Sequence, residues 1–255
     1  MSDPNREDAP FFIGFLSIPA GLRVSLAVCA VVLVAGFGAL GWAISAAQDD
    51  PGDGSFRFDY GRQTVTGVVY TEPAPHALIV TGNERIKAGH VLMFTAGGKS
   101  SVMPRARRLE GQLATLSGVL LKRGELDMMQ VRSGKNGLKP ADGEVPVMEV
   151  EQLGRWRLAG EICDGKCLAG AMRPGRGIAH KACANLCLIG DIPPVFVSTQ
   201  PVEGAEYLLV AGPDGKQMPR EWLDLVASYI MVEADIERRG DLLVMKIDPA
   251  SIRKL

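Results

Sequence analysis

The sequence lacks an excess of charge of either sign, with 28 Lys and Arg residues against 29 Asp and Glu residues. Without a basic excess there is no electrostatic footprint for nucleic acid. Aromatic residues make up only 6%, too few for a platform on which bases would stack. Glycine and proline are frequent, at 30 and 16 residues, which favours short strands joined by many turns. Nucleic-acid binding is therefore not expected.

One segment lacks charge altogether: residues 24–48 contain no Asp, Glu, Lys or Arg. About 20 apolar residues are enough to cross the hydrocarbon core of a membrane as a helix. The segment is longer than the apolar part of a signal peptide, about 7–15 residues, so an uncleaved transmembrane helix is predicted. A cleaved signal peptide is the competing interpretation, because Ser45-Ala46-Ala47 resembles a cleavage site. The preceding Arg6 and Arg23 favour a cytoplasmic N-terminus.

The rest of the chain repeats one strand pattern. The strand-like residues 64–69 correspond to 157–162 at an offset of 93. Gly98-Lys99 recurs as Gly215-Lys216 at an offset of 117, and the predicted hairpin turn 122–124 recurs as 238–240 at an offset of 116. The first offset is shorter by about 24 residues, which predicts an insertion of that length after the first strand of the second copy.

The repeated unit predicts a small, curved β-sheet that closes on itself. A first strand interrupted by Gly, a helical segment and a closing hairpin resemble an OB-like β-barrel, with a single β-sandwich as the alternative. The predicted fold class is mainly β, with one transmembrane helix and two tandem OB-like barrels. The predicted parts are a cytoplasmic segment 1–23, a transmembrane helix 24–48, a linker 49–61, a first domain 62–150, and a second domain 151–255 with a Cys/His insertion 163–187.

Outside one short stretch, the predicted soluble part lacks cysteine. Four of the five cysteines have the spacing C-x3-C, fifteen residues, C-x3-C: Cys163, Cys167, Cys183 and Cys187. Two structural disulfides are one interpretation if the compartment is oxidising. A site for Zn, Cu or an iron–sulfur cluster, with His180 and Met172 as further ligands, is the second. The third is a reactive thiol whose pKa is lowered by Lys166 and His180.

The stretch also lacks familiar catalytic patterns. It has no C-x2-C-H for covalent haem, no dinucleotide fingerprint and no recognisable triad, so no catalytic residue is assigned and a non-catalytic role is favoured. The fifth cysteine, Cys29, lies in the apolar segment and is expected to be a small apolar residue there.

Two resemblances bear on this stretch. Its spacing resembles the twin C-x3-C motif of small mitochondrial intermembrane-space chaperones, which implies the disulfide pairs Cys163–Cys187 and Cys167–Cys183. Residues 160–197 resemble a group of bacterial membrane-anchored proteins that combine such a Cys/His stretch with β-rich halves. That resemblance implies a protein of the bacterial envelope and no particular activity.

The expected function is that of an accessory or binding protein, anchored by a single pass in the bacterial inner membrane with its C-terminal domain in the periplasm. It would be a subunit or assembly factor of a membrane redox complex, and its partner would be a membrane or periplasmic protein. No cofactor is expected on this interpretation. The alternative is a metal-binding or thiol redox protein that uses the Cys/His stretch.

Overall fold

The computed structural model describes residues 20–47 and 52–255. The chain divides into two compact units, Met1–Asp50 and Pro51–Leu255. Residues 1–19 of the predicted N-terminal segment 1–23 lie outside the described residues. Residues 49–51 of the predicted linker also lie outside them.

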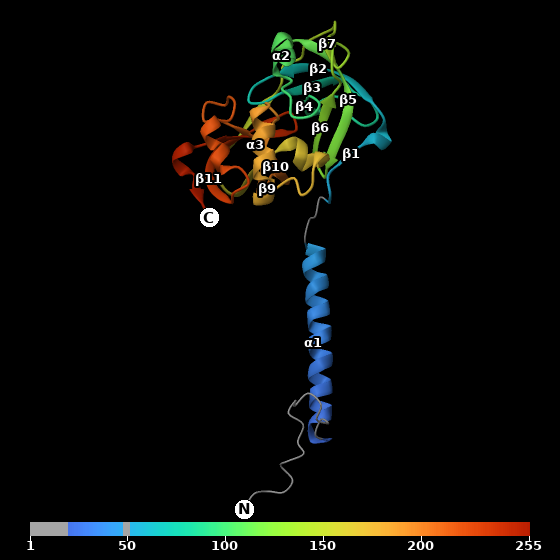
Figure 1. The fold of residues 1–255 in the computed structure, drawn as a ribbon, viewed down its shortest axis with the longest axis vertical. Coiled ribbons are helices and arrows are strands. Elements are labelled where there is room, and N and C mark those ends of the chain that lie inside the picture. Colours follow the sequence, from blue (N-terminus) through green and yellow to red (C-terminus); the bar gives the residue numbers. More distant parts are fainter. Residues whose placement is uncertain (1–19, 48–51) are drawn as a thin grey trace, which may run out of the picture. The chain divides into compact units, whose positions relative to one another are not determined.

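The described residues of the first unit form the helix α1 (Ala20–Ala47), which starts four residues before the predicted helix (Figure 1). Its residues Gly21–Ala46 have a mean hydropathy of 2.4 in their most apolar window, and none of that window is buried. A helix of 26 residues is about 39 Å long, and the hydrocarbon core is about 30 Å thick. The helix is therefore long and apolar enough for a single-pass anchor, and equally consistent with a signal sequence.

The second unit is mainly β and contains two closed five-stranded barrels. The first barrel consists of β2 (Gln63–Tyr70), β3 (His76–Thr81), β4 (Val91–Thr95), β5 (Leu113–Arg123) and β6 (Leu126–Val131). The strand order is β5-β2-β3-β4-β6, and pairing of β5 with β6 closes the barrel. Two short strands, β1 (Ser55–Phe56) and β7 (Leu138–Pro140), add to β5.

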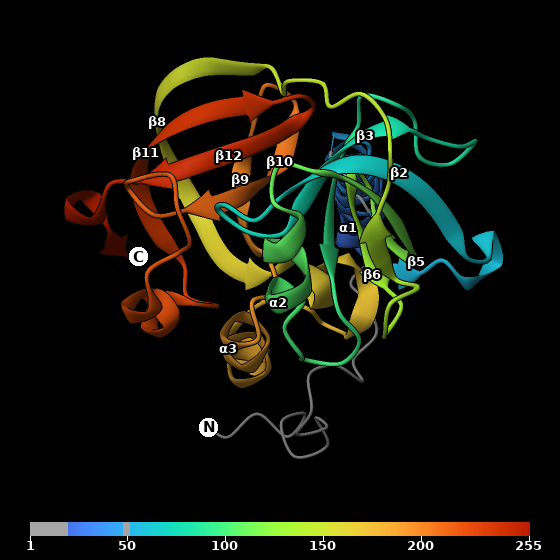
Figure 2. The same cartoon turned by 90° about the horizontal axis from the view of Figure 1, so that it is seen from above.

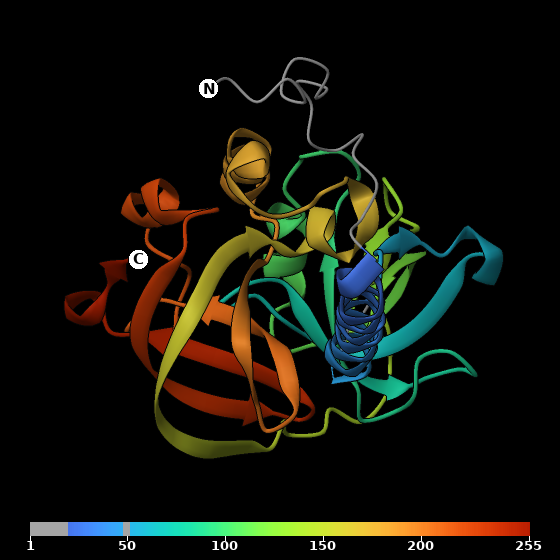
Figure 3. The same cartoon turned by 90° about the horizontal axis from the view of Figure 1, so that it is seen from below.

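The second barrel consists of β8 (Val150–Asp164), β9 (Pro194–Val202), β10 (Ala205–Ala211), β11 (Ile230–Arg239) and β12 (Leu242–Ile247). Its strand order is β12-β10-β9-β8-β11, closed by β11 and β12, and β13 (Arg253–Lys254) adds to β11. In both barrels the third and fifth strands pair in parallel. Figures 2 and 3 show the two barrels side by side. The short helical segments are α2 (Met103–Ala106), α3 (Lys181–Ile189), η2 (Phe58–Tyr60), η3 (Arg107–Leu109), η4 (Cys167–Ala171), η5 (Ile178–His180), η6 (Arg220–Leu225) and η7 (Pro249–Ser251).

The strand register follows the offsets of the sequence repeat. Val65 pairs with Leu116 in the first barrel. The residues that lie 93 and 116 positions later, Leu158 and Val232, pair in the second barrel. The repeat therefore marks equivalent positions of two barrels with the same topology. The alternative fold, a single β-sandwich, does not form, because each half of the unit closes into its own barrel.

Each first strand has a glycine at the same repeat position, where a neighbouring strand approaches closely. A Cβ on Gly67 would lie 2.6 Å from the Leu78 carbonyl oxygen, and one on Gly160 would lie 2.1 Å from that of Val197. Any side chain at these positions would push the second strand away, so glycine permits the tight curvature of both barrels.

The barrels have separate cores and a third core in common. One cluster belongs to the first barrel and includes Phe94, and another belongs to the second and includes Phe196. A further cluster joins Leu121 and Met128 of the first barrel to Val195 and Val244 of the second. Both barrels therefore lie within one compact unit. The predicted domain bounds 62–150 and 151–255 stay a prediction.

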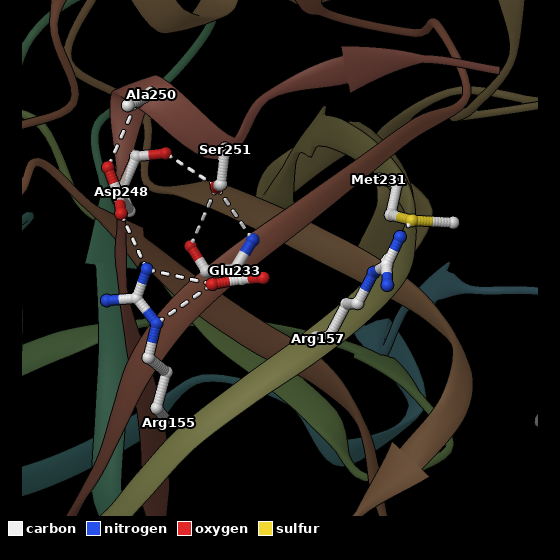
Figure 4. Close-up of polar contacts among 7 residues, drawn as sticks. All are labelled: Arg155, Arg157, Met231, Glu233, Asp248, Ala250 and Ser251. Atoms are coloured by element: carbon white, nitrogen blue, oxygen red, sulfur yellow. Dashed lines mark hydrogen bonds and ion pairs between the residues drawn. The ribbon is translucent and has the colours of Figure 1, made fainter.

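The C-terminal segment is attached to the second barrel by polar contacts (Figure 4). Arg155 of β8 forms ion pairs with Glu233, at 2.9 Å, and with Asp248, at 2.6 Å. Ser251 accepts a hydrogen bond from the Glu233 backbone N–H, and the Asp248 carboxylate accepts one from that of Ala250. These contacts fix the chain end to β8 and β11.

Candidate metal and thiol centre

The connection between the first two strands is where the barrels differ. It comprises residues 71–75 in the first barrel and residues 165–193 in the second, which is longer by 24 residues. This agrees with the difference between the repeat offsets. The longer connection contains η4, η5 and α3, shown in gold in Figure 3, and three of the four clustered cysteines.

Cys167 is positioned by the end of β8. The Asp164 carboxylate accepts a hydrogen bond from the Cys167 backbone N–H at 2.8 Å, which turns the chain into η4 immediately after the strand. The Cys167 side chain is buried. The aspartate that ends the strand thereby determines where the first thiol lies.

The two cysteines of α3 point towards Cys167. Cys183 and Cys187 are four residues apart on one helix, so their side chains share a face. The Cys167 Sγ lies 4.0 Å from that of Cys183 and 3.9 Å from that of Cys187. Three thiols therefore converge, with Cys167 next to both of the others.

His180, at the N-terminus of α3, completes the group. Its ligating nitrogen and the sulfurs of Cys167 and Cys183 all lie within 4.8 Å of one another. Asp164, Cys167 and Cys187 form a second such group, also within 4.8 Å. The buried His180 Nε2 lies 3.0 Å from an Asp164 carboxylate oxygen. Because a carboxylate only accepts, Nε2 donates, which leaves Nδ1 with the lone pair in the neutral ring.

The thiols are not equivalent in their acidity. The hydrogen bond with Cys187, together with burial, raises the pKa of the Cys167 thiol. The same hydrogen bond lowers the pKa of Cys187, because Cys167 donates to the Cys187 thiolate. Thiolates are the form of cysteine that binds metals and attacks electrophiles. Of the two, Cys187 is therefore the thiol more readily deprotonated.

Two cations lie beside this centre, Lys99 of the first barrel and Lys166 of the long connection. The Lys99 ammonium lies 3.1 Å from the Cys183 sulfur. The buried Lys166 ammonium donates to the backbone carbonyls of Ala96 and Gly98, at 2.8 and 2.7 Å. Burial lowers the pKa of Lys166, opposed by the nearby Cys187 and Cys167. The loop after β4 thus covers one side of the centre.

Met172 lies at the solvent side of the centre. It follows η4 in an extended conformation, and its Sδ lies 3.3 Å from the Cys183 Sγ. Its side chain is 45% exposed. Of the residues predicted for a metal site, Cys167, His180, Cys183, Cys187 and Met172 are brought together.

Cys163 is the exception. It precedes Asp164 in β8, and successive side chains of a strand point to opposite faces. Cys163 accordingly belongs to the core cluster common to both barrels, and burial raises its pKa, helped by the nearby Glu161. All four cysteines are free thiols here. The disulfide pairs Cys163–Cys187 and Cys167–Cys183 stay a prediction. In the structure Cys167 lies next to both cysteines of α3, and Cys163 lies in the core cluster.

Sequence reasoning missed Asp164, Lys99 and the position of Lys166. Asp164 had a signal, because it stands beside Cys163 at the predicted end of the first strand. Lys99 is 84 residues from Cys183, and nothing in its local sequence marks it. The remaining histidines lie elsewhere: His76 is buried and stacked on Tyr70, and His90 lies between Asp127 and Asp241.

Neither a protein-family model, nor a curated protein, nor a solved structure matches this chain. The resemblance to bacterial membrane-anchored proteins therefore stays an expectation.

Proposed function

We propose that this protein is a membrane-anchored periplasmic accessory protein that binds one thiophilic metal ion through Cys167, His180, Cys183 and Cys187. The observation that carries the proposal is the position of the Cys167 sulfur, next to both sulfurs of α3. This is the metal-binding alternative of the sequence analysis combined with its accessory role. The protein is not proposed to be an enzyme.

The distances between sulfurs suit a metal ion in their midst. In a tetrahedral site with Zn–S bonds of about 2.3 Å, two ligating sulfurs lie about 3.8 Å apart. The observed separations from Cys167 are 4.0 and 3.9 Å. Three thiolates and one imidazole form a Cys3His ligand set, which is a frequent set for zinc.

The contact between His180 and Asp164 supports the same proposal. A histidine that binds a metal usually donates its other ring N–H to a carboxylate, which fixes the tautomer and the ring orientation. Asp164 is fully buried and also accepts from the Cys167 backbone. One carboxylate therefore orients two of the four ligands from behind.

Two disulfides fit this arrangement less well. A disulfide between Cys167 and either cysteine of α3 leaves the other without a partner, since Cys163 points to the opposite face of β8. The pair Cys163–Cys187 would require a change in the end of that strand. A site that uses Cys167 together with both cysteines of α3 leaves the end of β8 as it is.

The barrels and the helix supply the rest of the proposal. A closed five-stranded barrel in which strands three and five pair in parallel supports the OB-like identity predicted from the sequence. Such barrels bind partners through their loops, so we assign them the contact with a membrane redox assembly. The apolar α1 supports single-pass anchoring.

Metal content tests the proposal. The full-length protein, reduced and purified in detergent without oxygen, is loaded with Zn²⁺, passed through a desalting column and analysed for metal and free thiols. We expect one zinc per chain, lost in Cys167→Ser and retained in Cys163→Ala, which removes a thiol of the same stretch outside the centre. A wild-type chain without zinc, or equal loss in both variants, contradicts the proposal.

The compartment is tested separately. Alkaline phosphatase fused after Leu255 becomes active only if the domain is exported. Green fluorescent protein fused at the same position fluoresces only in the cytoplasm and not after passage through the general export route. We expect active phosphatase in the membrane fraction. Fluorescent fusions, or active phosphatase released into the soluble periplasm, would refute the periplasmic anchored topology.

A further inference from the structure

Met172 distinguishes the centre from an ordinary site of three cysteines and one histidine. Its thioether sulfur lies 3.3 Å from the Cys183 sulfur, although nearly half of the side chain faces solvent. Apolar burial alone does not require the thioether sulfur to lie on a thiol, since other parts of the side chain could cover the same area. Its position places a fourth sulfur at the edge of the centre.

The chemistry of a thioether discriminates between metals. Zinc is held in proteins by thiolate, imidazole and carboxylate ligands. Soft thioether and thiolate ligands together select copper(I). The contact between Met172 and Cys183 is therefore a feature that copper(I) can use and zinc cannot.

Burial defines a direction across the centre. Cys167, Cys187 and His180 are buried, whereas Cys183 is partly exposed. Leu186, three residues after Cys183 on the same side of α3, is 57% exposed. The solvent side of the centre is thus the side of Met172 and Cys183, and the inner side is that of Cys167 and Cys187.

We propose that the metal ion is copper(I), and that it enters and leaves through Met172 and Cys183. This inference rests on the proposed function, since it names the metal of the same centre. The ion contacts the Met172 sulfur, then the Cys183 thiolate, and then the inner thiolates of Cys167 and Cys187. Each thiol that binds loses its proton to solvent. Copper remains in the +1 state throughout, so the step is an exchange of ligands without electron transfer.

Competition with chelators tests the inference on the full-length protein in detergent, reduced and without oxygen. Copper(I) affinity is measured against bathocuproine disulfonate, and Zn²⁺ affinity against a chromogenic zinc chelator. The test variant is Met172→Leu, which keeps size and hydrophobicity but removes the sulfur. The matched control is Met231→Leu, at a half-buried methionine of β11 whose sulfur contacts Arg157 (Figure 4).

We expect Met172→Leu to weaken copper(I) binding about tenfold or more, as loss of a supporting ligand does at other metal sites. Its Zn²⁺ affinity should equal that of the wild type, and Met231→Leu should change neither. X-ray absorption of the copper-loaded wild type should show sulfur as the main ligand.

The outcomes separate this inference from the proposed function. If Met172→Leu binds copper(I) like the wild type, or if it weakens the binding of copper(I) and of Zn²⁺ equally, the inference is wrong. The proposed function still holds in that case, provided that the protein binds one metal ion per chain. If the wild type binds neither ion, the proposed function itself is wrong.

Discussion

The two barrels have the same topology but differ where their first hairpin begins. In the first barrel Tyr70 pairs with His76, and the two rings stack. In the second barrel the last pair before the connection is Asp164 with Pro194. An aromatic stack closes a five-residue connection in one barrel, and a carboxylate opens a long connection with the thiol centre in the other. The barrel scaffold is therefore repeated, whereas the converging thiols lie in one connection of the second barrel.

The first prediction concerns the scaffold common to both barrels. Phe94 and Phe196 are fully buried, one in each barrel core. We expect Phe94→Ala and Phe196→Ala each to lower the free energy of unfolding by about 3–5 kcal/mol, because each leaves a cavity. Denaturant unfolding followed by tryptophan fluorescence and circular dichroism measures this.

Because the barrels have a core cluster in common, we expect one cooperative transition for each of these variants. Of the three tryptophans, Trp42 belongs to α1, whereas Trp156 and Trp222 belong to the second barrel. Fluorescence should therefore report the Phe94→Ala change as fully as circular dichroism does. Two separate transitions would show that the barrels are independent.

The second prediction tests the aromatic stack. Burial lowers the pKa of His76 to about 4, while its Nδ1 lies 2.7 Å from the Ala74 carbonyl oxygen. The unfolded chain takes up this proton near the ordinary pKa of 6.5, so stability present above that pH is lost as the pH falls towards 4. The loss amounts to about 3 kcal/mol. We expect His76→Phe, which keeps a ring against Tyr70, to lose less stability than the wild type between pH 7 and pH 4.

The third prediction tests the carboxylate of Asp164, which ends β8. Asp164→Asn keeps the shape but weakens the hold on His180, so we expect metal affinity to fall between about tenfold and a hundredfold. The matched control is Glu161→Gln, a buried carboxylate of the same strand that accepts from the Gly177 backbone outside the centre. An equal loss of affinity in both variants would mean that the strand, and not Asp164, orients the ligands.

The fourth and smallest effect concerns the contact between barrels. Burial disfavours the charged form of His90, but hydrogen bonds to Asp127 and Asp241 outweigh it and raise the pKa to about 10. The stability from this contact is present below about pH 6.5 and is lost as the pH rises towards 10. We expect Asp241→Asn to cost about 1 kcal/mol at pH 6. The cost should shrink at pH 9.5, and Asp142→Asn, at an exposed carboxylate, should cost nothing at either pH.

The barrels could be predicted because their signals are local. Each hairpin is set by neighbouring residues, so the repeat offsets predicted which strands correspond. The pairing of Leu158 with Val232 agrees with that correspondence. The position of Cys163 could not be predicted from spacing. The C-x3-C pattern suggested two thiols on one helical face, whereas β8 extends as far as Asp164 and the strand alternation turns Cys163 away. The role of Lys99 depends on a contact between barrels that no local pattern encodes.

The common core has a consequence for how this chain can be divided. A fragment that contains only the second barrel would expose Cys163, Val195 and Val244 to water. It would also lose Lys99 and the hydrogen bond from Ser101 to Asp191, which follows α3. The second barrel is therefore not a portable module. The connection that contains the thiols packs on both barrels through Leu168 and Ala169, so moving it to another protein would require both barrels to move with it.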